Sequence, residues 1–314
     1  MKDATSPGIG SMHSISKIEP SVYIIVLNYN NLYDTIESIR SVEKLNYENY
    51  KVLLVDNGST EGIIEEIRKK FPNLEIIKNE KNLGYAGGNN VGILKAMGGK
   101  ANYIFLLNND VVVERDVLRK LVDAMEREEH FAACQPLVSY FHEREKIWSA
   151  GTEFFIGYPR LYKKNKRAKL SGNFEPPVGL AGCALLMRIS AVKDVGLFDK
   201  SLFLMHEETE WCMRAKKKGY KLLVVTDAIV YHKVAVTLGL FGKTYLYYVS
   251  RNWLLVASKN FRWLMYLYVV VTELAVRLPY YMYHLFRRGQ LGTIKYYLKG
   301  IKDGLLGVTG EGVL

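Results

Sequence analysis

Cysteine is scarce in this chain of 314 residues, which has three in total. Cys134, Cys183 and Cys212 are widely spaced and form no C-x-x-C pair. This pattern excludes a disulfide framework and a structural zinc site of the usual spacing. We therefore expect a reducing compartment, with the three cysteines in the core.

The common nucleotide-binding glycine motifs are also missing. The glycine-rich stretch 82–90 fits neither G-x-G-x-x-G nor G-x-x-x-x-G-K. The glycine spacing therefore argues against a dinucleotide-dependent oxidoreductase and against a P-loop enzyme. Glycines ahead of a helix would still let backbone amides approach an anion, and a plain glycine-rich turn is the alternative.

No uninterrupted apolar run is long enough to cross a bilayer, which takes about 20 residues. The most apolar stretch, 263–286, is interrupted by Glu273, Arg277 and Pro279. The N-terminus lacks the charged-then-apolar pattern of a secretory signal. Residues 1–20 are polar, so we expect them to be disordered and exclude them from the fold.

The chain does have the composition of a folded protein, with 49% hydrophobic and 24% charged residues. Continuous apolar runs at 22–28, 50–55 and 103–108 are typical of strands buried on both faces. Helical patterns at 32–45 and 63–70 follow the first two. This alternation predicts right-handed crossovers in an α/β fold with a Rossmann-like, mostly parallel sheet. The other expected elements are strands at 74–78, 132–138, 180–187, 221–225 and 229–232 and helices at 91–97, 117–125 and 203–218.

Polar side chains follow the three buried runs where each strand ends. Asn28, Asp56 and Asp110 occupy these positions. In open α/β sheets ligands bind beyond the carboxyl ends of the strands, so Asp110 is expected at the mouth of a pocket, where it could coordinate a hard cation. The alternative is that Asp110 only caps a helix whose first turn starts at Glu114.

A cluster of acids opens the helix expected at 203–218. Glu207, Glu208 and Glu210 lie beside His206. They could simply complement the helix dipole. Crowded carboxylates also perturb each other's pKa values, however, so one of them is a candidate general base.

Positive charge is concentrated in the last quarter of the chain. From residue 233 onward there are eleven Lys or Arg and three acids, which is +8 of the total of +11. Interleaved aromatic residues favour an anionic membrane surface over nucleic acid as the partner. We expect an interfacial helix pair with Trp253 and Trp263 at the headgroups. The basic residues expected on lipid phosphates are Arg287, Arg288, Lys295 and Lys299. A bundle packed on the rest of the chain, or on a second copy in a homo-oligomer, is the alternative.

The ordered set of motifs resembles the family 2 glycosyltransferases of GT-A fold, especially rhamnosyltransferase-like members. The motifs are Asn28-Tyr29-Asn30, Asp56, 82–89, Asn108-Asn109-Asp110, Glu207-Glu208 and His232. The resemblance covers about 21–232 and implies a catalytic domain at 21–235. The charge and aromatic content of the rest predict a basic, amphipathic helical region at 236–314.

The resemblance also implies roles for individual residues. Glu208, or its neighbour Glu207, would be the catalytic base, and Asp56 would bind the base of the nucleotide. Asp110 and His232 would hold Mg²⁺ or Mn²⁺, with modest affinity because Asn108-Asn109-Asp110 offers a single carboxylate. The implied nucleotide-sugar-binding residues are Asn28, Tyr29, Asn30, Asp56, Asn82, Gly87, Asn89, Asn109 and Asp110.

The expected reaction is a single in-line displacement with inversion, in which a carboxylate deprotonates the acceptor hydroxyl. The donor would be dTDP-rhamnose or a UDP-sugar, and the acceptor a lipid-linked or polysaccharide glycan. The expected location is the cytoplasmic face of the cell membrane, as a peripheral protein with no nucleic-acid partner. A catalytically silent membrane-bound scaffold or nucleotide-sensing module is the alternative.

Overall fold

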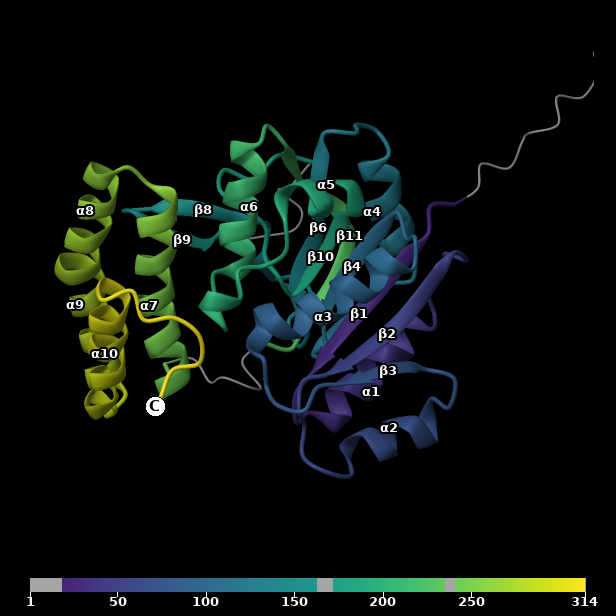
Figure 1. Cartoon of the computed structure of the whole chain (residues 1–314), viewed down its shortest axis with the longest axis horizontal. Helices are drawn as coiled ribbons and strands as arrows, with labels where there is room; N and C mark the ends of the chain where they lie inside the picture. The colour runs from purple at the N-terminus through teal and green to yellow at the C-terminus, as the bar shows by residue number, and fades with distance from the viewer. Residues whose placement is uncertain (1–18, 163–171, 235–240, 314) are drawn as a thin grey trace, which may run out of the picture.

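A nine-stranded mixed sheet forms the centre of the molecule (Figure 1). The computed structural model describes residues 19–162, 172–234 and 241–313, so nearly all of the predicted disordered segment 1–20 lies outside the described residues. The strands of the sheet are β1 (Val22–Asn28), β2 (Tyr50–Asp56), β3 (Glu75–Lys78), β4 (Tyr103–Asn108), β5 (Val111–Val113), β6 (Phe131–Tyr140), β7 (Ile147–Ser149), β10 (Ala184–Arg188) and β11 (Lys221–His232). Their order is β3-β2-β1-β4-β10-β6-β11-β5, with β7 beside β6.

The first half of the sheet is parallel, as the alternation of strands and helices predicted. Strands β3, β2, β1 and β4 run in one direction, whereas β10 lies antiparallel between β4 and β6. Strand β11 is parallel to β6, and β5 is antiparallel to β11. The α/β class is therefore confirmed, with a mixed sheet.

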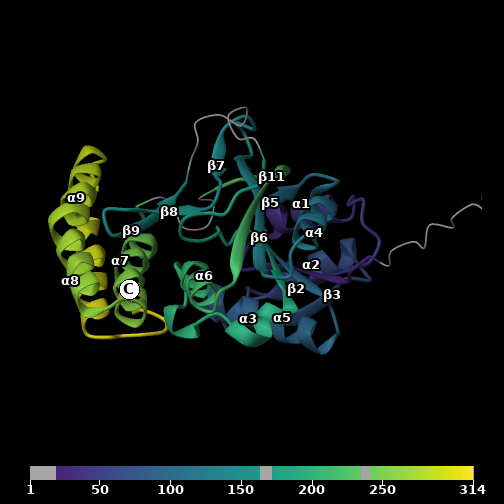
Figure 2. The same cartoon turned by 90° about the horizontal axis from the view of Figure 1, so that it is seen from above.

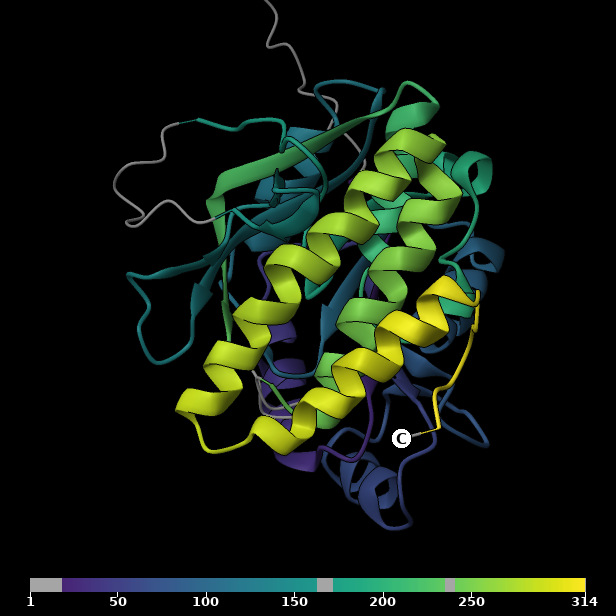
Figure 3. The same ribbon diagram turned by 90° about the vertical axis from the view of Figure 1, so that its left-hand side faces the viewer.

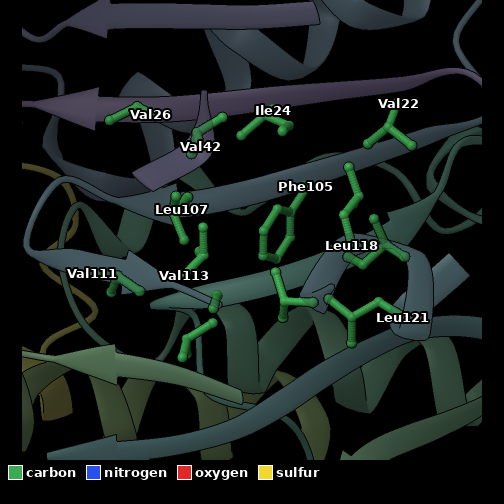
Figure 4. Close-up of a cluster of buried hydrophobic side chains, with 14 of the residues drawn as sticks. Val22, Ile24, Val26, Val42, Phe105, Leu107, Val111, Val113, Leu118 and Leu121 are labelled. Atoms are coloured by element: carbon green, nitrogen blue, oxygen red, sulfur yellow. The ribbon is translucent and has the colours of Figure 1, made fainter. Parts of the chain in front are cut away.

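Helices cover both faces of the sheet. They are α1 (Leu32–Val42), α2 (Ile63–Lys70), α3 (Gly84–Gly98), α4 (Val117–Met125), α5 (Ile189–Val195) and α6 (Glu207–Lys217). Side chains alternate between the two faces of a strand. On β1, Val22, Ile24 and Val26 therefore join the core under α1 and α4 (Figure 4), whereas Tyr23 and Ile25 join the core under α3, α5 and α6.

Helix α3 starts at Gly84 rather than at the predicted position 91, so most of the glycine-rich stretch is helical. A Cβ atom on Gly88 would lie 2.6 Å from Leu27 Cδ1, and one on Gly92 would lie 2.6 Å from Ile25 Cγ2. These glycines let the helix pack closely on β1. Tertiary packing here outweighs the low helix propensity of glycine.

The alternative in which Asp110 only caps a helix is wrong, because strand β5 follows Asp110 and α4 begins at Val117 after the N-cap Asp116. One expectation about element boundaries was also wrong. The strands predicted at 221–225 and 229–232 form one strand, β11, with a shift in pairing between Val225 and Ile229.

The C-terminal helices form a separate layer at one side of the sheet (Figures 1 and 3). They are α7 (Lys243–Asn260), α8 (Trp263–Thr272), the π-helical turn η3 (Glu273–Arg277), α9 (Leu278–Arg287) and α10 (Ile294–Leu305). Helix α7 is the inner one, and the hairpin β8 (Thr152–Phe155) and β9 (Tyr158–Leu161) reaches toward this layer (Figure 2). Among the described helices, none combines the length and hydrophobicity needed to cross a membrane.

Trp253 corrects the expectation for this region. Its side chain is fully buried, and its indole Nε1 donates to Gly157 O, so it packs inside the layer and not at a membrane surface. Trp263 is 69% exposed. Composition predicted both tryptophans at the headgroups, but helix packing separates them.

Candidate active site

Asn28 joins the carboxyl ends of three neighbouring strands. Its Nδ2 donates to Asp56 Oδ1 at 3.1 Å and to Ser59 Oγ at 3.2 Å. Its Oδ1 accepts from Thr35 Oγ1 at 2.9 Å and from Asn109 Nδ2 at 3.2 Å. Strand pairing places Asn28 opposite Asp56 and next to the end of β4. The polar strand ends predicted to meet at one edge of the sheet are therefore in contact.

Tyr29 and Asn30 lie on the exposed side of this cluster. Asp56 is fully buried, and its Oδ2 accepts from the Ser59 amide at 3.3 Å. Asn30 has a left-handed φ of 53°, and its Oδ1 accepts from the Thr60 amide at 2.8 Å. These bonds fix the loop after β2 against the loop after β1.

The predicted residues of the glycine-rich stretch are divided between a turn and a helix. Asn82 Oδ1 accepts from Asn57 Nδ2 at 2.9 Å and from the Gly84 amide at 2.8 Å. Gly87 and Asn89 lie within α3 and are buried, and Asn89 Nδ2 donates to its own helix. Asn82 is thus the member of this group that lies in the turn at the strand ends.

A cavity of about 870 Å³ lies between the strand ends and the C-terminal helices. This volume falls in the range of ligand-binding sites. Predicted residues that line it are Asn109, Asp110, Glu208 and His232. Other lining residues are His206, which the sequence analysis noted only as a neighbour of the acids, and Tyr158, Tyr245 and Tyr280, which the sequence did not indicate. Tyr158 comes from the hairpin, His206 from the turn before α6, and Tyr245 and Tyr280 from the C-terminal layer. These segments are distant in the sequence, so no local periodicity predicts that they meet.

Asp110 and His232 form a close pair in this cavity. The pairing of β5 with β11 sets Val111 opposite His232, and His232 Nε2 lies 3.1 Å from Asp110 Oδ1. The rings of Trp148 and His232 are perpendicular to each other, with their centroids 4.6 Å apart. Burial lowers the pKa of His232, but Cys183 and Asp110 outweigh this and raise it to about 10.

Glu208, rather than Glu207, lines the cavity. Glu207 is 3% exposed, and its Oε2 has no hydrogen-bond partner among the described residues. Burial raises the pKa of Glu208 to about 7. Burial, and then the nearby Glu208, raise the pKa of Glu207 well above its usual range. Near neutral pH, Glu208 is therefore the carboxyl that can lose and regain a proton in the cavity.

The fold is the GT-A fold, which two solved structures share. One is GalNAc-T7 with UDP, GalNAc and Mn²⁺, with a TM-score of 0.64 and 17% identity over 92% of this chain and 56% of that chain. The present chain therefore spans little more than half of that protein. The other is the mannosyltransferase PcManGT from Pyrobaculum calidifontis with GDP-Man and Mn²⁺, with a TM-score of 0.60 and 13% identity over 92% of this chain and 88% of that chain.

Sequence comparison identifies the family. Residues 21–196 match the model of glycosyl transferase family 2, and the chain belongs to this family. It is 30% identical over 208 residues to the N-acetylglucosaminyl-diphospho-decaprenol L-rhamnosyltransferase of Mycobacterium tuberculosis, covering 60% of this chain and 68% of the relative. It is 21% identical over 306 residues to the dTDP-rhamnosyl transferase RfbF of Shigella flexneri, covering 93% and 98%. The predicted rhamnosyltransferase-like family is confirmed.

Proposed function

We propose that the protein is a metal-dependent inverting glycosyltransferase that transfers L-rhamnose from dTDP-rhamnose to a lipid-linked glycan. The observation that carries this proposal is that Asp110, His232 and Glu208 line one cavity. Asn109 connects this cavity with Asn28 and the strand ends. The two rhamnosyltransferase relatives support the donor, and the mycobacterial one supports a diphosphate-lipid acceptor. A UDP-sugar is the second candidate donor.

Asp110, and His232 once the ion has displaced its ring proton, suit a Mg²⁺ or Mn²⁺ ion that is shared with the donor. Within the described residues, no three His, Cys, Asp or Glu side chains are grouped so that they could hold a metal ion alone. A protein that supplies one or two ligands and leaves the rest to phosphate oxygens and water is usual for nucleotide-bound Mg²⁺. Such an ion would stabilise the negative charge of the departing nucleoside diphosphate.

Glu208 is the proposed general base. Its carboxylate would take the proton of the acceptor hydroxyl as that oxygen attacks the anomeric carbon, which gives inversion in one step. A base works best when its pKa lies near the working pH, and burial raises the pKa of Glu208 to about 7.

Transfer is expected to fall as the pH drops below about 7. The pKa of Glu208 is raised, so the active carboxylate is present above that value and protonated below it. Burial also raises the pKa values of Tyr85, Tyr158 and Cys212, so these neighbours stay neutral in this range. The measurement is kcat against pH at saturating donor and acceptor. A profile that stays flat down to pH values near 5 would exclude Glu208 as the base.

The outer face of the C-terminal layer is the proposed membrane-binding surface. Helices α8 and α9 and the turn η3 between them expose a large set of apolar side chains, which include Trp263, Leu264, Leu267, Val271, Leu274, Tyr283 and Phe286. Basic residues follow at the end of α9, among them Arg287 and Arg288. An apolar helix face bordered by cations suits peripheral attachment to an anionic membrane, here at its cytoplasmic face.

The double variant Leu267→Glu/Phe286→Glu is expected to lose sedimentation with anionic liposomes, because two charges would enter the apolar face. Transfer to a lipid-linked acceptor should fall far more than donor hydrolysis. Binding by the unchanged protein should weaken as salt rises, since charges are screened within about 8 Å at physiological ionic strength.

Leu94→Glu is the matched control, because Leu94 lies on α3 and is 55% exposed, compared with 51% for Leu267. It should sediment like the unchanged protein. If the double variant still sediments, or the unchanged protein never does, the result would instead support a packed bundle or an interface with another copy of the chain.

Release of nucleoside diphosphate separates the proposed enzyme from a catalytically silent scaffold or nucleotide sensor. Purified protein would be incubated with dTDP-rhamnose or a UDP-sugar, with and without Mn²⁺. The proposal predicts slow release without acceptor and faster release with it. Donor binding without any release, under every condition, would support the silent alternative.

A further inference from the structure

The turn that leads into α6 holds an uncommon backbone conformation. Phe203, Met205 and His206 have φ values of 62°, 74° and 70°. Non-glycine residues rarely adopt positive φ, and they keep it only where the surrounding structure fixes them. Glu207 and Glu208 follow at once as the first residues of α6. The direction in which Glu208 points therefore depends on whatever fixes this turn.

Asn252 on α7 binds the turn through its side-chain amide. Its Nδ2 lies 2.7 Å from Leu202 O, 2.6 Å from Leu204 O and 2.9 Å from Met205 O. Asn252 Oδ1 accepts from Arg251 Nε at 2.8 Å, which orients the amide so that Nδ2 faces the carbonyls. One side chain thus contacts three carbonyl oxygens of the strained turn.

Arg251 adds a second attachment from the same helix. Its Nη2 donates to Leu202 O at 3.0 Å, and its Nη1 donates to Gly310 O at 2.7 Å. The Gly310 amide in turn donates to Ser201 O at 2.7 Å. Arg251 and Asn252 are both fully buried. A buried guanidinium is costly unless its donors are satisfied, and here they are directed to the turn and to the C-terminal segment.

The geometry points to Arg251 and Asn252 as positioning residues that hold the turn 202–206 and so place Glu208 in the cavity. This inference rests on the proposed role of Glu208 as the base. It makes the C-terminal layer part of the active site, in addition to its proposed contact with the membrane. The neighbouring Trp253 supports the same contact, because its ring lies 5.7 Å from that of His206.

The variant Asn252→Ala is expected to lower kcat by about 10- to 100-fold, the usual effect of misplacing a catalytic group by about 1 Å. The KM for the donor, and the Kd for dTDP in the presence of Mn²⁺, should stay unchanged, because the proposed donor-binding residues Asn28, Asp56 and Asp110 lie outside the turn. Steady-state kinetics and calorimetric titration with dTDP measure these quantities.

Ser250→Ala is the matched control on the same helix. Ser250 is equally buried, but the carbonyl oxygens within hydrogen-bonding distance of its Oγ are Leu246 O, Tyr247 O and Tyr297 O, none of which belongs to the turn. It should lower the unfolding temperature and leave kcat unchanged. A folded Asn252→Ala protein with the unchanged kcat, or a Ser250→Ala protein with an equal loss of kcat, would overturn the inference.

If Asn252→Ala does not fold, the same kinetic measurements on Arg251→Lys test the inference. Lysine keeps the charge but cannot reach Leu202 O, Asn252 Oδ1 and Gly310 O together, so kcat should fall at unchanged donor affinity. An unchanged kcat would overturn the inference.

The variant Glu208→Gln distinguishes the proposed catalytic base from the proposed positioning role of Arg251 and Asn252. If Glu208→Gln stays active, the proposed base is wrong, whereas an inactive Glu208→Gln beside a fully active Asn252→Ala removes only the positioning role.

Discussion

Replacing Asp110 with alanine is expected to abolish the metal-dependent part of nucleotide binding and to lower transfer by on the order of 10³ or more, because charge stabilisation by a metal contributes several kcal/mol. Asp110 supplies the single carboxylate of the Asn108-Asn109-Asp110 motif, and its Oδ1 lies 3.1 Å from His232 Nε2 in the cavity. His232 alone would leave the ion without an anionic protein ligand. Calorimetric titration with dTDP, with and without Mn²⁺, measures the effect directly.

Asp123→Ala is the control for this variant. Asp123 lies on α4 and is exposed, so its removal takes away a negative charge without touching the cavity. It should bind dTDP as the unchanged protein does. If Asp110→Ala folds and keeps its Mn²⁺-dependent affinity for dTDP, the metal must be held elsewhere or not used.

Glu208→Gln is expected to fold, to bind the donor and to lose about two to four orders of magnitude in transfer, the usual contribution of a general base. Glutamine has nearly the same shape as glutamate but cannot take the proton of the acceptor hydroxyl. Glu208 lines the cavity, and its raised pKa suits this task. The measurement is kcat for transfer, together with the Kd for dTDP.

Glu207→Gln is the matched comparison, because it makes the same change one residue away on α6. Glu207 is buried outside the cavity lining, so its loss should lower transfer much less. A larger loss at Glu207 than at Glu208 would reassign the base to Glu207.

The strand ends were predictable because two simple rules apply to them. The apolar runs before Asn28, Asp56 and Asn108 are typical of buried strands, and parallel strands bring their carboxyl ends to one edge. The contacts from Asn28 to Asp56 and Asn109 follow from this arrangement. The start of α3 was not predictable in the same way, because Gly88 and Gly92 weaken a helix locally and are required only by its close packing on β1.

The far side of the cavity depends on contacts between segments that are distant in the sequence. Composition could not tell the buried Trp253 from the exposed Trp263. Glu273 and Arg277 were read only as interruptions of an apolar run, yet both are buried, with Arg277 Nη1 donating to Glu273 Oε2 at 2.5 Å. The role of Asn252 could not be predicted from the sequence, because the carbonyl groups that it contacts lie about fifty residues earlier in the chain.

The sequence alone could not show whether Glu208 or Glu207 faces the cavity, because this depends on the orientation of α6. Adjacent residues on a helix point about 100° apart, so one residue of difference decides which carboxyl faces the cavity. The left-handed turn at His206 sets that orientation, and positive φ at a non-glycine residue leaves no mark in the sequence.

The most direct test of the central claim is mass spectrometry of the acceptor after incubation with purified protein, Mn²⁺ and dTDP-rhamnose in anionic liposomes that contain an N-acetylglucosaminyl-diphospho-lipid. The proposed function predicts an acceptor heavier by one deoxyhexose, formed together with dTDP and absent with Glu208→Gln. UDP-sugars tested in parallel report the second candidate donor. An acceptor that stays unmodified by every donor, while the folded protein binds the nucleotide, would contradict the claim that this chain is a sugar-transferring enzyme.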